Sequence, residues 1–232
     1  MVARTLRRSV HWGDLFDRHS AEQTVADVRT VLERRRSMGS EEETRPEEET
    51  RPEEETRPKT GTGDAPDHGD ASTADGDDGP DIDRIVADAD VLAADLLVGG
   101  AARAALDTVR RHSWLTLVAT PELLADARAV IADLADPALA SAWHALAADR
   151  IVLVEQPPGD HPALAAAYHG GAMHVLSFDP ALTSAAAGVA IRDRVPISVR
   201  EPQAFVAVFD PERVYPTVVG GEYPGPDRDP RE

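Results

Sequence analysis

The stretch "RIVADADVLAADLL", Arg84–Leu97, joins a short apolar run to two acidic residues. Its beginning, Ile85–Ala87, has the apolar and β-branched character of a buried strand. Asp88 and Asp90 follow at once, although burying a carboxylate is costly unless the group is hydrogen-bonded or paired with a cation. The stretch therefore predicts a core strand that ends on acids, which either cap helices or hold a metal ion.

Apolar segments of strand length alternate with helical patterns from this stretch onward. The expected strands are 84–88, 115–120, 150–155, 173–178 and 195–199. The expected helices are about 91–111, 121–134, 137–148 and 162–169, with further helices from 180 and from about 202. This alternation is typical of a parallel sheet with helices on both faces.

We therefore predict a three-layer α/β/α domain with a central parallel sheet over residues 83–209, followed by a C-terminal tail at 210–232. Ligands in such sheets bind beyond the carboxyl ends of the strands. The residues that follow each strand are therefore the first candidates for a functional site.

Two segments of different composition precede this domain. In residues 1–37, the run Ser20–Arg36 opens with a Ser-x-x-Gln capping box and has apolar residues at helical spacing. We expect a helical module that packs on the main domain or on a copy of itself, or that binds a partner or RNA through its arginines. Residues 38–82 contain the unit "EEETRP" three times and then many Gly, Pro and Asp residues. So little apolar surface predicts a disordered acidic linker.

The overall composition excludes several classes of protein. The 232-residue chain has a formal net charge of −18, no cysteine, and Lys59 as its single lysine. Disulfides and cysteine-ligated zinc are therefore excluded. No apolar run approaches the roughly 20 residues that span a membrane, so we expect a cytoplasmic protein without a membrane partner. The acidic, lysine-poor composition is similar to that of proteins from halophilic archaea.

Acidic residues recur near the ends of the expected strands, and each has an ordinary explanation when taken singly. Asp179 precedes a proline as in many helix starts, Asp126 suits an exposed helix position, and Asp160 suits a turn. Taken together, clustered carboxylates repel one another unless a cation joins them, and oxygen ligands favour Mg²⁺ or Mn²⁺. Such a site activates water and stabilises in-line displacement at a phosphodiester.

The order and spacing of these acids resemble the PIN (PilT N-terminus) nuclease domain over about residues 83–209. Four segments carry the resemblance: "VADADVL" with Asp88 and Asp90, "ATPELLADARAVI" with Asp126, "GDHPALAAAYHGGA" with Asp160, and "VLSFD" with Ser177 and Asp179. This chain differs where members usually carry Asn at the position of Asp90, Glu at that of Asp126 and Thr at that of Ser177.

The resemblance implies metal-dependent hydrolysis of single-stranded RNA. It implies that Asp88, Asp126 and Asp179 hold Mg²⁺ or Mn²⁺, that Asp160 is a further catalytic acid, and that Ser177 orients a ligand or water. A protein such as an antitoxin and a second copy of the chain are the implied candidates for association. The alternative is a PIN-like module that no longer cleaves and serves regulation or protein binding.

The pattern Asp88-x-Asp90 after a strand is also similar to the start of a haloacid-dehalogenase-type phosphatase. That class and the response-regulator receivers use a downstream lysine to stabilise phosphate. No lysine follows Lys59, and arginine is a poor replacement for a compact ammonium group. Both classes are therefore disfavoured.

Overall fold

The centre of the molecule is a five-stranded sheet in which every pair of neighbouring strands is parallel. The computed structural model describes residues 10–19, 22–43, 79–157, 161–192 and 196–232. The strands are β1 (Asp81–Ala87), β2 (Thr116–Ala119), β3 (Val152–Leu153), β4 (Ala172–Leu176) and β5 (Ser198–Arg200). The predicted parallel α/β architecture is therefore confirmed.

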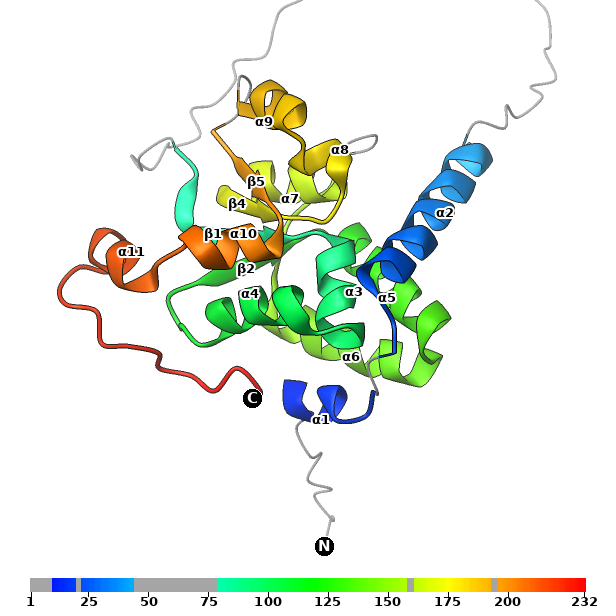
Figure 1. The fold of residues 1–232 in the computed structure, drawn as a ribbon, viewed down its shortest axis with the longest axis horizontal. Helices are drawn as coiled ribbons and strands as arrows, with labels where there is room; N and C mark the ends of the chain where they lie inside the picture. Colours follow the sequence, from blue (N-terminus) through cyan, green and yellow to red (C-terminus); the bar gives the residue numbers. More distant parts are fainter. Residues whose placement is uncertain (1–9, 20–21, 44–78, 158–160, 193–195) are drawn as a thin grey trace, which may run out of the picture.

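Helices cover both faces of this sheet (Figure 1). One face carries α7 (Pro162–His169), which contacts β1, β2 and β4, with α8 (Pro180–Thr183) and α9 (Ala185–Arg192) on the same side. The other face carries α3 (Ala89–Leu97), α4 (Gly100–Arg110), α5 (Pro121–Leu134), α6 (Pro137–Arg150) and α10 (Pro202–Val208). The chain ends with α11 (Pro211–Val218) and an extended segment. This arrangement is consistent with three α/β/α layers.

The strand order is β3-β2-β1-β4-β5, so the chain moves outward from β1 in one direction and then returns to add β4 on the other side. A doubly wound sheet of this kind has its ligand crevice at the carboxyl ends of the two strands where the direction changes. Those strands are β1 and β4. Segments that follow Ala87 and Leu176 therefore meet at the switch point of the sheet.

The structure corrects some predicted boundaries. The single helix expected at 91–111 is two helices, because Gly99 and Gly100 have φ values of 74° and 57°, which interrupt the helix and are readily adopted only by glycine. The strand expected at 150–155 is reduced to β3. The tail expected at 210–232 is not separate, because the backbone N–H groups of Asp227 and Arg228 donate to the carbonyl of Arg111.

The N-terminal segment packs on the domain through two helices, α1 (Trp12–Phe16) and α2 (Val25–Glu43). Buried Val28, Val31 and Leu32 place α2 against α3 and α5, which confirms that this helix docks on the main domain. α2 extends to Glu43 and β1 begins at Asp81, so the linker predicted over 38–82 is wrong at both of its ends. Residues 44–78 lie outside the described part of the chain.

The start of α2 differs from the predicted capping box. Ser20 lies outside the described residues, and the side-chain nitrogen of Gln23 donates to the carbonyl of Leu134 instead, at 3.2 Å. Thr24 and Asp27 cap the helix reciprocally: the Thr24 N–H donates to the Asp27 carboxylate at 2.9 Å, and the Asp27 N–H donates to the Thr24 hydroxyl at 3.3 Å. This is the same motif, shifted by four residues.

Among the described residues, no helix is both long and apolar enough to span a membrane.

His174 on β4 is a buried titratable residue that packs against aromatic side chains. Its ring lies 5.7 Å from that of Phe205 and 5.5 Å from that of Phe209, and both ring nitrogens are buried without a hydrogen-bond partner. Burial, assisted by the positive charge of Arg200, lowers the pKa of His174 from 6.5 to about 4. The imidazole is therefore neutral in the folded protein near pH 7.

We expect this histidine to make the protein unstable in mild acid. The unfolded chain takes up the proton near pH 6.5 but the folded chain only near pH 4, so stability is lost as pH falls through this window, by about 3 kcal/mol. Denaturant unfolding at pH 7, 5 and 4 should show a shallower acid loss for His174→Leu. The exposed His169 provides the matched control, because His169→Leu should keep the steep loss. Equal acid loss in His174→Leu and the native chain would contradict this role.

Candidate functional site

Asp88 is the first residue after β1 and is fully buried. It forms the N-cap of α3, where one carboxylate oxygen, Oδ1, accepts the N–H of Ala89 at 2.7 Å. The other oxygen, Oδ2, accepts the hydroxyl of Ser177 at 2.9 Å. Capping therefore explains part of this carboxylate's surroundings, while its second oxygen is directed to the end of β4.

Ser177 and Asp179 bring the end of β4 to the same place. The buried Ser177 hydroxyl donates to Asp88 and accepts the N–H of Asp179 at 3.0 Å. Asp179 is the N-cap of α8, where its Oδ1 accepts the N–H of Ala181 at 2.8 Å. The side chain of Asp179 remains partly exposed and lies 3.8 Å from the guanidinium of Arg29. The predicted residues of β1 and β4 are thus joined by one hydrogen-bond relay.

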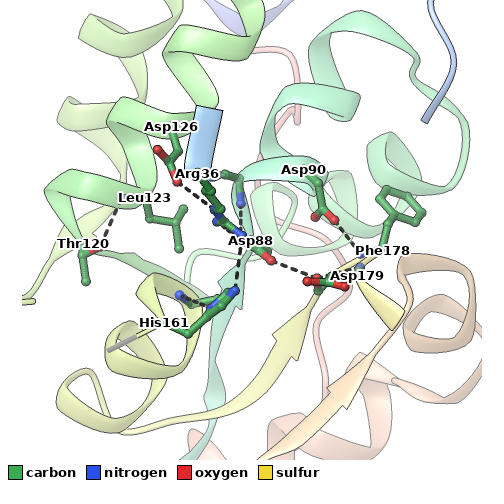
Figure 2. Close-up of polar contacts among 12 residues, drawn as sticks. Arg36, Asp88, Asp90, Thr120, Leu123, Asp126, His161, Phe178 and Asp179 are labelled. Atoms are coloured by element: carbon green, nitrogen blue, oxygen red, sulfur yellow. Dashed lines mark hydrogen bonds and ion pairs between the residues drawn. The ribbon is translucent and has the colours of Figure 1, made fainter. Parts of the chain in front are cut away.

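Asp90 lies in the first turn of α3 and is also buried, with only 1% of its surface exposed. Its Oδ2 accepts the N–H of Phe178 at 3.0 Å, which ties the end of β4 to α3 (Figure 2). Its Oδ1 is buried without any hydrogen-bond partner. Burial, and then the nearby charge of Asp88, raise the pKa of Asp90 well above 3.8. This second carboxylate is therefore held at a substantial electrostatic cost.

Asp126 on α5 is linked to Asp88 by Arg36, an arginine that we did not predict as a site residue. Arg36 of α2 donates from Nε to the Asp126 carboxylate at 3.2 Å and from Nη2 to Asp88 at 3.3 Å (Figure 2). Burial lowers the pKa of Arg36, but Asp88 and Asp126 outweigh burial and raise it. The sequence signal was the run Arg34–Arg36, which we expected at the end of the N-terminal helix, whereas it lies well inside α2.

His161 also contacts this guanidinium. Its Nε2 lies 3.3 Å from Nη1 of Arg36, and its Nδ1 accepts the N–H of Ala163 at 3.3 Å as the N-cap of α7. Burial lowers the pKa of His161, which favours the neutral ring. A neutral imidazole accepts at one nitrogen only, and in His161 that nitrogen is Nδ1, which accepts from Ala163. The neighbouring Asp160, the expected further catalytic acid, lies outside the described residues.

The donor set suits a hard divalent cation, because it consists of carboxylate oxygens with one hydroxyl close by. In the described part of the chain, no three His, Cys, Asp or Glu side chains are grouped so as to hold a metal ion. Figure 2 shows the guanidinium of Arg36 between the carboxylates of Asp88 and Asp126. A cation bound by both carboxylates would have to replace it.

The comparisons with known proteins identify a family but no activity. A family model described as "Family of unknown function (DUF7384)" matches residues 79–231. No curated protein and no solved structure matches the chain. The matched region includes the whole sheet and the acids at its switch point, and it includes the C-terminal segment that we expected to be a tail. Both N-terminal helices, α1 and α2, lie outside it.

Proposed function

The chain belongs to the DUF7384 family of unknown function, and on the chemistry of its site we propose that it is a PIN-like, metal-dependent endoribonuclease acting on single-stranded RNA. The observation that supports the proposal is that two buried acids follow β1, and that Asp88 is linked to Asp126 through Arg36 and to the end of β4 through Ser177. Asp88 directly follows the central strand β1, and Asp90 lies in the first turn of α3. Asp126 lies on α5, and Asp179 follows β4 as the N-cap of α8.

Buried carboxylates are difficult to explain by stability alone. A buried charge costs several kcal/mol unless it is paired, and Asp90 keeps one oxygen without a partner. Proteins retain such costs mainly at functional sites, where titratable groups with perturbed pKa values gather in a crevice. A doubly wound sheet offers that crevice where β1 meets β4.

The proposed roles follow from what each side chain can reach. Asp88, Asp126 and Asp179 are the proposed ligands of Mg²⁺ or Mn²⁺, and the Ser177 hydroxyl fixes the orientation of the Asp88 carboxylate. Asp90 fastens the end of β4 to α3. A bound divalent ion would supply a more acidic water and would neutralise charge developing on the phosphate. Asp160 remains a proposed further catalytic acid.

The test is cleavage of a labelled single-stranded RNA by the full chain, with Mn²⁺ or Mg²⁺ in concentrated salt. Asp88→Asn keeps the size of the side chain and can still accept a hydrogen bond, but it removes the ligand charge, so we expect cleavage to fall by about 100-fold or more. Asp107→Asn, on α4 and paired with Arg110, is the matched control and should cleave like the native chain. Equal cleavage by Asp88→Asn and the native chain would refute the proposal.

A second candidate is favoured by the arginine itself. Because Arg36 already compensates Asp88 and Asp126, the same arrangement suits a non-cleaving PIN-like module whose acids serve only to hold α2. Such a module would act through a protein partner or a second copy of the chain. It predicts that neither divalent ion binds at this site in any variant that keeps the fold.

A further inference from the structure

We propose that α2 is an intramolecular inhibitor of the candidate site, in which the Arg36 guanidinium takes the position of the divalent cation. This inference rests on the proposed metal-dependent function and concerns the regulation of the same site. Its starting point is that one side chain from outside the matched family region joins two of the proposed metal ligands, Asp88 and Asp126.

The guanidinium and a divalent cation would compete for the same oxygen atoms. Arg36 lies 3.3 Å from Asp88 Oδ1 and 3.2 Å from Asp126 Oδ2, and these are oxygens that the proposed site needs. The positive charge satisfies buried Asp88 electrostatically, so the site is stable without metal. The same charge would repel an arriving cation at close range. Metal and Arg36 therefore cannot occupy the site together.

Further contacts along α2 fasten the helix over this site. Arg29, two turns earlier on the helix, lies 3.8 Å from the third proposed ligand, Asp179. Arg35 pairs with Asp133 on α5 at 2.9 Å. Val28, Val31 and Leu32 are buried, and their burial further stabilises the docked helix. This apolar contact does not depend on the acids, so it keeps α2 docked over the site, which is the closed form. The helix leaves the site only when a ligand binds the open form, with α2 displaced, better than the closed form.

The position of α2 in the chain suits reversible displacement. Residues 44–78 connect it to β1, so a displaced helix stays tethered and returns at high effective concentration. Divalent cation and RNA phosphate together are the proposed displacing ligands, since the cation binds the acids that Arg36 leaves. The expected result is an enzyme that its own N-terminal segment holds inactive until divalent cation and RNA are both present.

The experiment measures Mn²⁺ binding to the full chain by calorimetry, in parallel with RNA cleavage. Arg36→Gln removes the competing charge, so we expect its Mn²⁺ affinity to rise about tenfold or more, and cleavage to rise with it. Arg35→Gln is the matched control: it removes the same charge from the adjacent position, whose partner is Asp133, and should bind Mn²⁺ like the native chain.

The outcomes separate this inference from the proposed function. Tighter Mn²⁺ binding by Arg36→Gln but not Arg35→Gln supports it. If the native chain binds Mn²⁺ and Arg36→Gln binds it no better, inhibition by Arg36 is refuted while the metal site stands. If neither chain binds Mn²⁺ or cleaves RNA, the proposed function fails and the inhibitor with it.

A covalent closure tests whether the helix itself must move. The chain has no cysteine, so cysteines placed at Arg35 and Asp133, an exposed ion pair, can be joined by a short bifunctional thiol reagent. In the Arg36→Gln background, the crosslinked chain should lose RNA cleavage, and the same chain before crosslinking should keep it. Full cleavage with α2 pinned would contradict its role as a cover.

Discussion

Replacing Asp95 with alanine is expected to lower the free energy of unfolding by about 3–5 kcal/mol, because it leaves two guanidinium groups without their buried partner. Asp95 on α3 has a side chain only 1% exposed. Arg103 donates from Nε to its Oδ1 at 2.5 Å, and Arg110 pairs with it from the other side. Both arginines come from α4, so this carboxylate fastens α4 to α3.

The same cluster supports the N-terminal segment. The guanidinium of Arg103 lies 3.1 Å from the ring centroid of Phe16, and that of Arg110 lies 4.3 Å from that of Trp12. These cation–π contacts hold α1 on the surface of α4. Loss of Asp95 should therefore loosen α1 as well as the α3–α4 corner.

The measurement is denaturant unfolding at neutral pH, with Asp149→Ala as the control. Asp149 pairs with the adjacent Arg150 but is 77% exposed, and exposed pairs contribute about 1 kcal/mol at most. A loss of less than about 1 kcal/mol in Asp95→Ala would show that the cluster is solvated in solution. Substitution of Asp95 tests the structure independently of the proposed nuclease activity.

Replacing Phe205 with alanine is expected to cost a similar amount, about 3–5 kcal/mol, for a different physical reason. Phe205 on α10 is completely buried, its ring stacks on Phe209 with centroids 4.7 Å apart, and it meets His174 edge to face. Truncation removes the transfer energy of the ring and leaves a cavity beside β4. The surrounding backbone belongs to α10, α4 and the sheet and can collapse only in part.

Two variants calibrate this result. Phe205→Leu keeps most of the side-chain volume and should lose clearly less stability than Phe205→Ala. Val206→Ala changes the next residue, which is 42% exposed, and should stay within about 0.5 kcal/mol of the native chain. Equal losses in Phe205→Ala and Val206→Ala would contradict the buried position of α10.

These two positions lie away from the candidate site, so they also separate stability from activity. Asp95 supports α3, whose first turn carries Asp90, and Phe205 packs behind β4, whose end carries Ser177. If Asp95→Ala or Phe205→Ala cleaves RNA less well, the loss of activity should match the fraction of the protein that is unfolded. Substitution of Asp88, by contrast, should remove cleavage while the protein remains folded.

Much of the fold was predictable from local patterns in the sequence. The helices Pro121–Leu134 and Pro162–His169 were predicted to the residue, because Pro at the first helical position follows a capping residue and because apolar positions have helical spacing. The parallel sheet followed from the alternation of strand-like and helical segments. The break at Gly99 was missed because the residues on either side of it have a helical pattern, which predicts one continuous helix. The positive φ of Gly99 interrupts that helix.

The candidate site was likewise predictable only in part. The sequence by itself determined which acids follow which strands, because strand ends and helix caps depend on neighbouring residues. Only the tertiary structure decided that β1 and β4 are neighbours, that Asp90 binds the backbone of Phe178, and that Arg36 lies between Asp88 and Asp126. These contacts join residues 52 to 90 positions apart. Their formation depends on how whole helices pack, which no local pattern of residues encodes.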